Sequence, residues 1–269
     1  MKFSELDAKM RVYETTNDRC VLPGIYMVAR IDGRHFHTLT KESGNFEAPF
    51  DEKFRDYMIG TVEHLMTKSG FNFIYGYTES DEISLLFALE SQDFGRKLRK
   101  LNSILAGEAS AKFSLLYGDI GVFDCRICEL PTKDNVVDYF RWRNEDANRN
   151  ALNAWCYWTL RKNGQDSKTA TKAIEGISVA EKNELLFQYG INFNDLPLWQ
   201  KRGIGFYFGS TMFGEPKQRC VKGLSETSLD HMYWEMFDRE GAERCRLKVD
   251  MNLPMGNAYG EFIRDKFLN

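Results

Sequence analysis

The stretch FNFIYGYTESDEISLLFAL, residues 71–89, decides the fold that we expect for this chain. Two apolar and aromatic runs, 71–77 and 82–89, are separated only by the polar residues TESD at 78–81. Short apolar runs bounded by a polar turn are typical of two strands joined as a hairpin. The sequence therefore predicts a β-hairpin whose turn is acidic.

The segments around this hairpin extend the prediction to a whole sheet. Residues 24–32 (GIYMVARID) and 121–130 are predicted strands, while 51–68 and 93–117 carry apolar residues at helical spacing. The resulting order, β-α-β-β-α-β, is that of ferredoxin-like sheets. Nucleic-acid polymerases build their palm on this plan, as do many unrelated proteins. We expect an α+β fold with a ferredoxin-like, polymerase-type palm.

The rest of the chain is predicted to be mostly helical at first and to form a fingers-like region. The expected palm-like catalytic region is 1–133 and the fingers-like and C-terminal region is 134–269, within one compact unit. No assignment is made for 223–269. Helices are expected at 134–162 and 180–189. A β-hairpin is expected to form from residues 203–213 and 217–222.

Composition indicates a globular protein outside the membrane. The 269 residues are 43% hydrophobic and 28% charged, with a net charge of -3. No apolar run approaches the roughly 18 residues that cross a bilayer, and the polar N-terminus does not resemble a secretory signal. We expect a cytoplasmic protein. Cys125 and Cys128 form a C-x-x-C, but on a strand they would face opposite sides, which favours a structural role over a metal site.

Positive charge is concentrated in the later middle of the chain. Residues 141–222 hold 13 Lys and Arg against 8 Asp and Glu, whereas residues 1–140 hold 17 against 22. An anionic partner would therefore meet the later segment, although such a segment is also ordinary on a solvated surface.

Asp32 and Asp81 are the candidate catalytic and metal-binding residues. Asp32 ends an apolar strand directly before Gly33, and Asp81 lies in the hairpin turn. In the expected strand order the two carboxylates can meet, and hard divalent cations favour such oxygen ligands. Two carboxylates on a pair of ions match the two-metal arrangement of phosphoryl transfer.

The acidic turn itself supports a cation. Glu79, Asp81 and Glu82 place three carboxylates in four residues, without the Gly or Asn that hairpin turns favour. A bound cation would offset their repulsion. The alternative is that these are ordinary polar residues at strand ends, and the pattern alone does not decide between the two.

Several sequence blocks resemble the tRNA-histidine guanylyltransferase family and its like-proteins. They follow the family order and cover most of residues 24–208. The blocks are RIDGRHFH (30–37), NFEAPFD (45–51), YTESDEISLLF (77–87), FDCRICELP (123–131), DYFRWRNEDANRNALNAWCYW (138–158), EKNELLFQYGINFNDLP (181–197) and KRG (201–203).

The resemblance implies a 3′-to-5′ polymerase that adds nucleotides to the 5′ end of tRNA. In such enzymes an NTP activates the RNA 5′ end, and the 3′-hydroxyl of an incoming GTP or other NTP then attacks the activated phosphate. The implied ligands of two Mg²⁺ ions are Asp32, the Gly33 carbonyl and Asp81. Family members assemble as tetramers, so a homo-oligomer is expected.

Further residues match the family's nucleotide-binding positions. The backbone N–H groups of 33–37 could bind triphosphate oxygens, and Phe36 or His37 could pack against a base or sugar. For Phe36, packing in the core is an equally open alternative. A phosphate could also bind where the helix 180–189 begins. The implied nucleotide-binding residues are Asp32, Gly33, Arg34, His35, Phe36, His37, Ser80, Asp81, Lys182 and Asn183.

Basic residues are candidates for tRNA contact. A solvated helix surface would explain them equally well. The candidates are Lys97, Arg99 and Lys100, and, within 141–222, Arg141, Arg143, Arg149, Arg161, Lys162, Lys168 and Lys172.

Two departures from the family pattern concern the substrate. Asn148 stands where members that add guanosine to tRNA-His carry a His, and Ala48 replaces a usual Lys. The first departure favours a like-protein that repairs truncated tRNA 5′ ends, without excluding guanylate addition. The metal ligands are retained.

Two other function classes stay open at this point. A nucleotidyl cyclase or conventional polymerase could share the palm, but the blocks at 138–158 and 181–203 would then have no reason to match. A non-catalytic tRNA-binding module would be favoured by loss of a metal carboxylate, and both are present.

Overall fold

The computed structural model describes residues 1–42, 46–210, 234–235 and 245–269. Its strands form one antiparallel sheet in the order β4-β1-β3-β2-β5-β7-β6. The strands are β1 (Tyr26–Gly33), β2 (Phe73–Glu79), β3 (Glu82–Phe87), β4 (Phe123–Leu130), β5 (Ile204–Ser210), β6 (Trp234–Glu235) and β7 (Cys245–Asp250). The helices are α1 (Phe3–Thr15), α2 (Phe36–Glu42), α3 (Glu52–Lys68), α4 (Leu98–Tyr117), α5 (Lys133–Lys162), α6 (Ser167–Ile174), α7 (Val179–Gln188), α8 (Leu198–Arg202) and α9 (Asn257–Phe267), with short 3₁₀ turns η1 (Asp93–Arg96) and η2 (Phe193–Asp195).

The predicted order of strands and helices is present in the first half of the chain. β1, α3, β2, β3, α4 and β4 follow one another, and their strands lie side by side in the order β4-β1-β3-β2. β5 then pairs with β2 and extends the same sheet. The chain therefore has an α+β fold with an antiparallel sheet.

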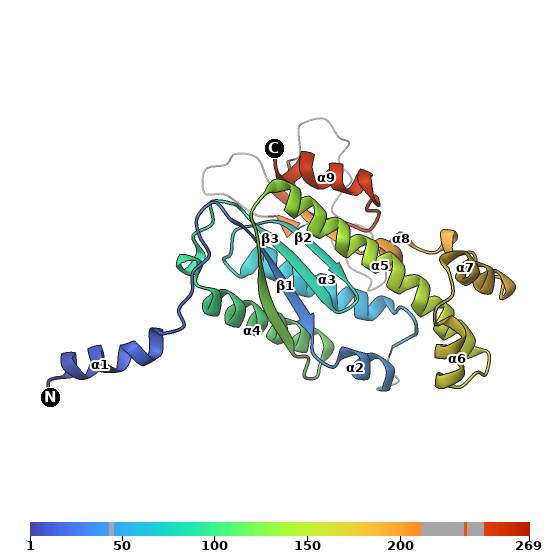
Figure 1. Cartoon of the computed structure of the whole chain (residues 1–269), viewed down its shortest axis with the longest axis horizontal. Helices are drawn as coiled ribbons and strands as arrows, with labels where there is room; N and C mark the ends of the chain where they lie inside the picture. Colours follow the sequence, from blue (N-terminus) through green and yellow to red (C-terminus); the bar gives the residue numbers. More distant parts are fainter. Residues whose placement is uncertain (43–45, 211–233, 236–244) are drawn as a thin grey trace.

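Alternating residues of β1 bury both faces of the sheet. Met27, Ala29 and Ile31 pack into a core with α3 and α4, whereas Tyr26 and Val28 pack into a second core with α5 and α9. Successive side chains of a strand point to opposite faces, so one strand serves both layers. Figure 1 shows α5 and α9 covering one face of the sheet and α3 and α4 lying behind it.

The same alternation settles the two cysteines of the C-x-x-C. Cys125 packs against the core formed with α3 and α4, and Cys128 packs against the opposite core. Neither is in a disulfide. The prediction that they face opposite sides is confirmed.

The C-terminal half of α5 extends beyond the sheet and forms a small core of its own. Ala151, Leu152 and Cys156 pack there with Leu186 of α7 and Phe193 of η2. In Figure 1, α6 and α7 lie beyond this end of α5, away from the strands.

The predicted helix over 93–117 is wrong in its first turn. Residues Phe94, Gly95 and Arg96 have positive φ angles of 51°, 61° and 58°, which a right-handed α-helix does not allow. The kink lets the buried Arg96 guanidinium donate to backbone carbonyls at 21, 22, 25, 89 and 91. The long helix consequently begins at Leu98.

Five described α-helices were not predicted: α1, α2, α6, α8 and α9. α2 has only seven residues, and every residue of α1 is at least partly exposed, so neither carries a clear apolar periodicity. The expected strand at 217–222 lies outside the described residues; the described partners of β5 are β2 and β7. None of the helices in the described part of the chain is long and apolar enough to cross a membrane.

Candidate active site

The turn between β2 and β3 is as tight as a hairpin turn can be. Glu79 and Glu82 are paired across the two strands, so only Ser80 and Asp81 form the loop. Ser80 has a φ of 48°, in the left-handed region that usually requires Gly or Asn. The turn therefore holds a non-glycine residue in a strained conformation directly beside Asp81.

Asp32 lies beside this turn because β1 pairs with β3. Asp32 is opposite Glu82 in the register, and the N–H of Gly33 donates to the carbonyl of Asp81 at 3.1 Å. A Cβ placed on Gly33 would lie 2.8 Å from Asp81 Oδ2 and 2.5 Å from the Phe36 ring. Only a glycine lets the end of β1 approach the Asp81 carboxylate this closely.

Arginine side chains lie close to two of the three carboxylates in the acidic turn. Arg143 Nε and Nη2 donate to the two oxygens of Glu82 at 2.7 and 2.9 Å, and Nη2 lies 3.5 Å from Glu79. Arg30 lies 2.5 Å from Glu82 on its other side. The predicted cation is therefore not needed for Glu82, which pairs with two guanidinium groups. Burial and the nearby Glu82 raise the pKa of Glu79 to about 8 in spite of Arg143.

Asp81 is the carboxylate of the turn that these arginines leave free. Among the described residues, neither Lys nor Arg lies within ion-pair distance of it; Ser80 Oγ donates to it at 3.0 Å. Burial raises the pKa of Asp81, and the neighbouring Asp32 raises it further, against the effect of hydrogen bonds and of His37. Burying a carboxylate without a cationic partner costs free energy, so a bound cation would stabilise the ionised Asp81 side chain.

Asp32 is more open. Its side chain is 34% exposed, and the guanidinium groups of Arg30 and Arg126 each lie 3.8 Å from Oδ2. At that separation the arginines do not occupy its lone pairs fully. Asp32 can therefore accept a further ligand on its solvent side.

The carboxylates of Asp32 and Asp81 fit a Mg²⁺ site in which the substrate supplies the remaining ligands. Among the described residues, no three His, Cys, Asp or Glu side chains form a cluster able to hold a metal. Mg²⁺ is usually held by one or two carboxylates together with substrate phosphates and water. Asp32, Asp81 and the Gly33 carbonyl supply that smaller set.

A cleft of about 400 Å³ opens from the two aspartates toward α3, α5 and α8. Its lining includes Asp32 and Asp81 and also Phe50 and Trp199, whose rings are in edge-to-face contact with centroids 5.9 Å apart. The cleft therefore presents both carboxylates and aromatic rings. A nucleoside triphosphate would match this lining, because its base can pack against aromatic rings and its bound cations can contact carboxylates.

The backbone after Asp32 offers fewer phosphate donors than predicted. The Gly33 N–H bonds to Asp81, and the Arg34 N–H donates to the Val122 carbonyl at 2.7 Å. Both are thereby occupied, and the prediction of free N–H groups throughout 33–37 is wrong for them. The amides of residues 35–37 are left, where α2 begins.

The side chains of this loop separate into core and surface. Phe36 is only 2% exposed and packs against Phe54, Phe113 and Phe123. The expectation that its ring contacts a base is wrong, because the ring belongs to the aromatic core. The exposed side chains are Arg34, His35 and His37.

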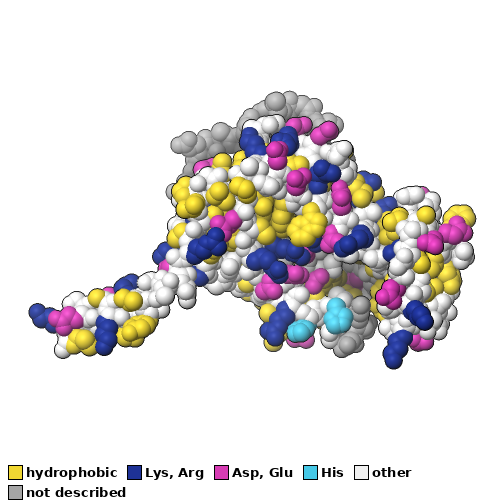
Figure 2. Space-filling view, in the orientation of Figure 1, with side chains coloured by type: hydrophobic (Ala, Val, Ile, Leu, Met, Phe, Trp, Pro, Cys, Tyr) yellow, Lys and Arg dark blue, Asp and Glu magenta, His cyan; other side chains and the backbone are white. Residues whose placement is uncertain are grey.

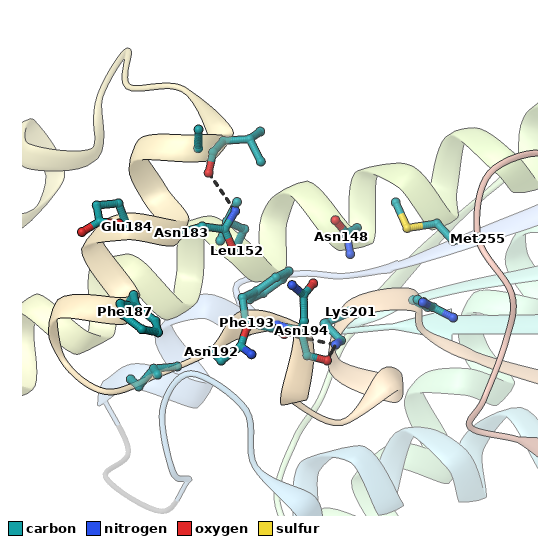
Figure 3. Close-up of a pocket in the computed structure, with 14 residues that line it drawn as sticks. Asn148, Leu152, Asn183, Glu184, Phe187, Asn192, Phe193, Asn194, Lys201 and Met255 are labelled. Atoms are coloured by element: carbon teal, nitrogen blue, oxygen red, sulfur yellow. Dashed lines mark hydrogen bonds between the residues drawn. The ribbon is translucent and has the colours of Figure 1, made fainter.

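Lys182 and Asn183 are not brought to the aspartates. Both lie on α7, and Asn183 lines a second cavity of about 500 Å³ together with Asn148 and Lys201. Asn183 donates from its amide to the Val179 carbonyl at 2.8 Å. Figure 3 shows residues lining this cavity on α5, on α7 and on the segment that leads to α8. Neither Lys182 nor Asn183 lines the cleft beside Asp32 and Asp81.

The basic candidates also divide. Arg143 is 4% exposed and fully engaged with carboxylates, so its predicted contact with RNA is wrong. Lys97 and Arg99 both pair with Asp18. Figure 2 shows Lys and Arg interspersed with acidic side chains over this face, without one continuous basic surface. Besides Lys97 and Arg99, the candidates that are exposed or half-buried are Lys100, Arg141, Arg149, Arg161, Lys162, Lys168 and Lys172.

The sequence reasoning missed the buried ion network behind the turn. Arg30 received no role, Glu82 was considered only as part of the acidic turn, and Arg143 was assigned to RNA. A signal was present, because three carboxylates in one short turn require a positive charge nearby. Nothing local in the sequence says which arginine supplies it.

Two family models match the chain. The model described as tRNAHis guanylyltransferase matches residues 7–131, and that described as Thg1 C terminal domain matches 134–247. Among curated proteins, a probable tRNA(His) guanylyltransferase of Drosophila melanogaster is 30% identical over 228 residues, which are 81% of this chain and 79% of that protein. The tRNA(His) guanylyltransferase of Candida glabrata is 30% identical over 196 residues, 68% and 82% of the two chains.

Solved structures are similar over nearly the whole chain. A bacterial tRNA(HIS) guanylyltransferase (Thg1)-like protein in complex with ATP gives a TM-score of 0.73 at 27% identity, covering 98% of this chain and 100% of that one. A structure of a bacterial tRNA(HIS) guanylyltransferase (Thg1)-like protein in complex with GTP gives a TM-score of 0.69 at 26% identity. The tRNA(His) guanylyltransferase from Saccharomyces cerevisiae gives 0.67 at 28% identity, covering 72% and 90%.

Proposed function

The chain belongs to the tRNA-histidine guanylyltransferase family, and we propose that Asp32, Asp81 and the Gly33 carbonyl hold the Mg²⁺ ions of its reaction. It is a nucleotidyltransferase that acts at the 5′ end of tRNA. The observation that carries the metal assignment is the contact of β1 with the acidic turn, where Gly33 donates to Asp81 and leaves no room for a Cβ.

In this proposal the four strands β4-β1-β3-β2 form a polymerase-type palm. Their order and antiparallel pairing are those of a ferredoxin-like sheet, and the two aspartates meet at one end of its central strands. The region from residue 134 would then act as fingers. Its division from the palm stays a prediction, since one sheet contains strands from both regions.

The reaction joins an incoming NTP to an activated tRNA. The 3′-oxygen of the NTP bonds to the activated 5′ phosphorus, while the bond from that phosphorus to its leaving group breaks. Bound Mg²⁺ would neutralise charge on the phosphates and align them for in-line displacement. The chain's own contribution is to hold Asp32 and Asp81 rigidly at the mouth of a cleft that takes the NTP.

The residues proposed for nucleotide contact are those that remain accessible. The amides of residues 35–37 can donate to phosphate oxygens, and Ser80 lies beside Asp81. ATP and GTP are bound by the bacterial like-protein, which supports NTPs as substrates here. Binding of tRNA over the exposed basic residues, a tetrameric assembly and a cytoplasmic location are further proposals from the resemblance.

We favour 5′-end repair over guanylate addition to tRNA-His. Asn148 replaces the His of guanosine-adding members, and the like-protein structures match 98% of this chain against 72% for the Saccharomyces enzyme. A palm-type cyclase or a conventional polymerase would not require the match to the C-terminal family model at 134–247.

The deciding experiment gives the purified protein a tRNA lacking its first nucleotide, with Mg²⁺, ATP and each NTP in turn. We expect addition at the 5′ end of the nucleotide that pairs with the opposing base. Guanosine added regardless of that base would identify guanylate addition to tRNA-His instead. A cyclic nucleotide product, or no transfer with any NTP, would overturn the proposed function.

A further inference from the structure

A buried group of charges lies directly behind the catalytic turn. The guanidinium of Arg143, on α5, contacts Glu82 at 2.7 and 2.9 Å, Asp146 at 3.1 Å and Glu79 at 3.5 Å. Glu79 is the last residue of β2 and Glu82 the first of β3. One side chain from α5 therefore contacts both ends of the turn that carries Asp81.

The network continues to Asp32. Glu82 also accepts from Arg30 at 2.5 Å, and Arg30 lies 3.8 Å from Asp32. The ring of Trp142 covers both guanidinium groups, with centroid distances of 4.6 Å to Arg143 and 5.7 Å to Arg30. The contacts thus run from α5 through β3 to β1 and end beside each aspartate.

The burial of this network makes its geometry rigid. Arg143 is 4% exposed and the Glu82 side chain 7%. A bidentate guanidinium–carboxylate pair fixes both distance and orientation, and low solvent exposure strengthens it. Removing the guanidinium would leave Glu79, Glu82 and Asp146 buried without their common partner, and such groups repel one another.

We propose that Arg143 is a positioning residue for the nucleotidyl transfer: by binding Glu79 and Glu82 it fixes the turn that holds Asp81 and, through Glu82 and Arg30, the carboxylate of Asp32. The inference rests on the proposed role of the two aspartates. Arg143 also lines the cleft, but its ion pairs are to Glu79, Glu82 and Asp146, so the proposed effect passes through the hairpin.

The consequence concerns cation binding as well as rate. With Arg143 removed, the mutual repulsion of the three acids would displace the ends of β2 and β3, and the Asp81 carboxylate would move relative to Asp32. A displacement of about 1 Å in a catalytic group can cost about a hundredfold in rate. The affinity for a divalent cation should fall in parallel, because both carboxylates are its ligands.

The test compares Arg143→Lys and Arg143→Met with the parent protein. Mn²⁺ binding is followed by electron paramagnetic resonance in the presence of GTP and without tRNA, and the single-turnover rate is measured at saturating tRNA. We expect Arg143→Met to bind Mn²⁺ about tenfold more weakly and to react about a hundredfold more slowly. Arg143→Lys should recover part of both losses, since it keeps the charge but not the bidentate contact.

A matched control removes an arginine from a surface ion pair. Arg264 on α9 pairs with Asp134 and is 43% exposed. Arg264→Met should leave Mn²⁺ affinity and rate unchanged. Circular dichroism and melting temperature are recorded for each variant, so that loss of fold is recognised.

The outcomes separate this inference from the proposed function. If Asp81→Asn loses Mn²⁺ binding while folded Arg143→Met binds like the parent, the positioning role is wrong and the metal site stands. If Asp81→Asn binds Mn²⁺ and reacts normally, the proposed function itself is wrong. If neither Arg143 variant folds, Arg143 serves the stability of the fold, and the positioning role is also overturned.

Discussion

The hairpin end of the sheet and the far end of α5 are both polar, but they are built in opposite ways. At the hairpin, Glu82 and Arg143 are almost fully buried and form an ion pair. Around α6 and α7, charged and apolar side chains such as Lys168, Phe187 and Tyr189 lie exposed. A buried, paired geometry can hold a reacting group in place, whereas an exposed surface can adapt to a large partner.

This difference teaches where each kind of function belongs. Chemistry on phosphate depends on positioning and charge, which the rigid end supplies. Contact with an RNA backbone depends on accessible positive charge and tolerates imprecise placement. Substitutions at the two ends should therefore differ in which measured quantity they change, and the predictions below are ordered by the size of that change.

The largest effect is expected at Asp81. Asp81→Asn keeps the shape of the turn and removes the charge of a proposed metal ligand, so the transfer rate should fall about a thousandfold or more. Affinity for tRNA, measured by filter binding, should stay within about twofold of the parent. Asp119→Asn, in an exposed loop, is the control. If tRNA affinity fell as much as the rate, the proposal that the hairpin serves chemistry and the α6 and α7 region serves RNA binding would be wrong.

A smaller effect is expected at Gly33. Gly33→Ala would place a Cβ 2.8 Å from Asp81 Oδ2 and 2.5 Å from the Phe36 ring. We expect a loss of about 1–3 kcal/mol in the free energy of unfolding and a rate about 10- to 100-fold lower. Denaturant unfolding and single-turnover kinetics measure the two.

Gly107 on α4 provides the matched comparison. An added Cβ there meets nothing within 4 Å, so Gly107→Ala should stabilise the helix by about 0.5–1 kcal/mol and leave the rate unchanged. Equal behaviour of the two alanine variants would show that the end of β1 tolerates displacement. The rigid character assigned to that end would then be wrong.

The smallest effect is expected at the exposed end. The double substitution Lys168→Gln and Lys172→Gln on α6 should weaken tRNA binding several-fold and lower the slope of log affinity against log salt by about one to two. The rate at saturating tRNA should not change. Lys68→Gln, at the exposed end of α3, is the control. An unchanged salt slope would move the RNA-binding surface away from α6.

Sequence patterns predicted much of the fold. The continuous apolar run of β1 and the helical spacing of α3 placed these elements within two residues of their observed ends. A strand that is buried on both faces is apolar throughout, whereas a helix that is buried on one side repeats its apolar residues every three or four positions. A turn was also predicted between the two apolar runs, at 78–81, but the observed loop is only Ser80 and Asp81, because Thr78 and Glu79 pair with β3 as the end of β2. Short or exposed helices such as α1 and α2 have no such pattern and were missed.

The candidate site was predicted only where function depends on residue type and local position. Asp32, Gly33 and Asp81 stand out by their place at the ends of strands. Phe36 and Arg143 were given wrong roles, because an aromatic ring or a guanidinium serves equally well in a core, an ion network or a ligand contact. Their surroundings, not their types, decide among these uses.

The sequence by itself predicted the strands β1 to β5, the long helices and the two candidate aspartates, because each of these depends on neighbours within a few residues. Only the tertiary structure decided what neutralises the acidic turn. Glu82 and Arg143 are 61 residues apart and meet because α5 packs across the sheet. Electrostatic pairing depends on distance in space, and the chain brings those charges together only when the whole sheet and its covering helix have formed.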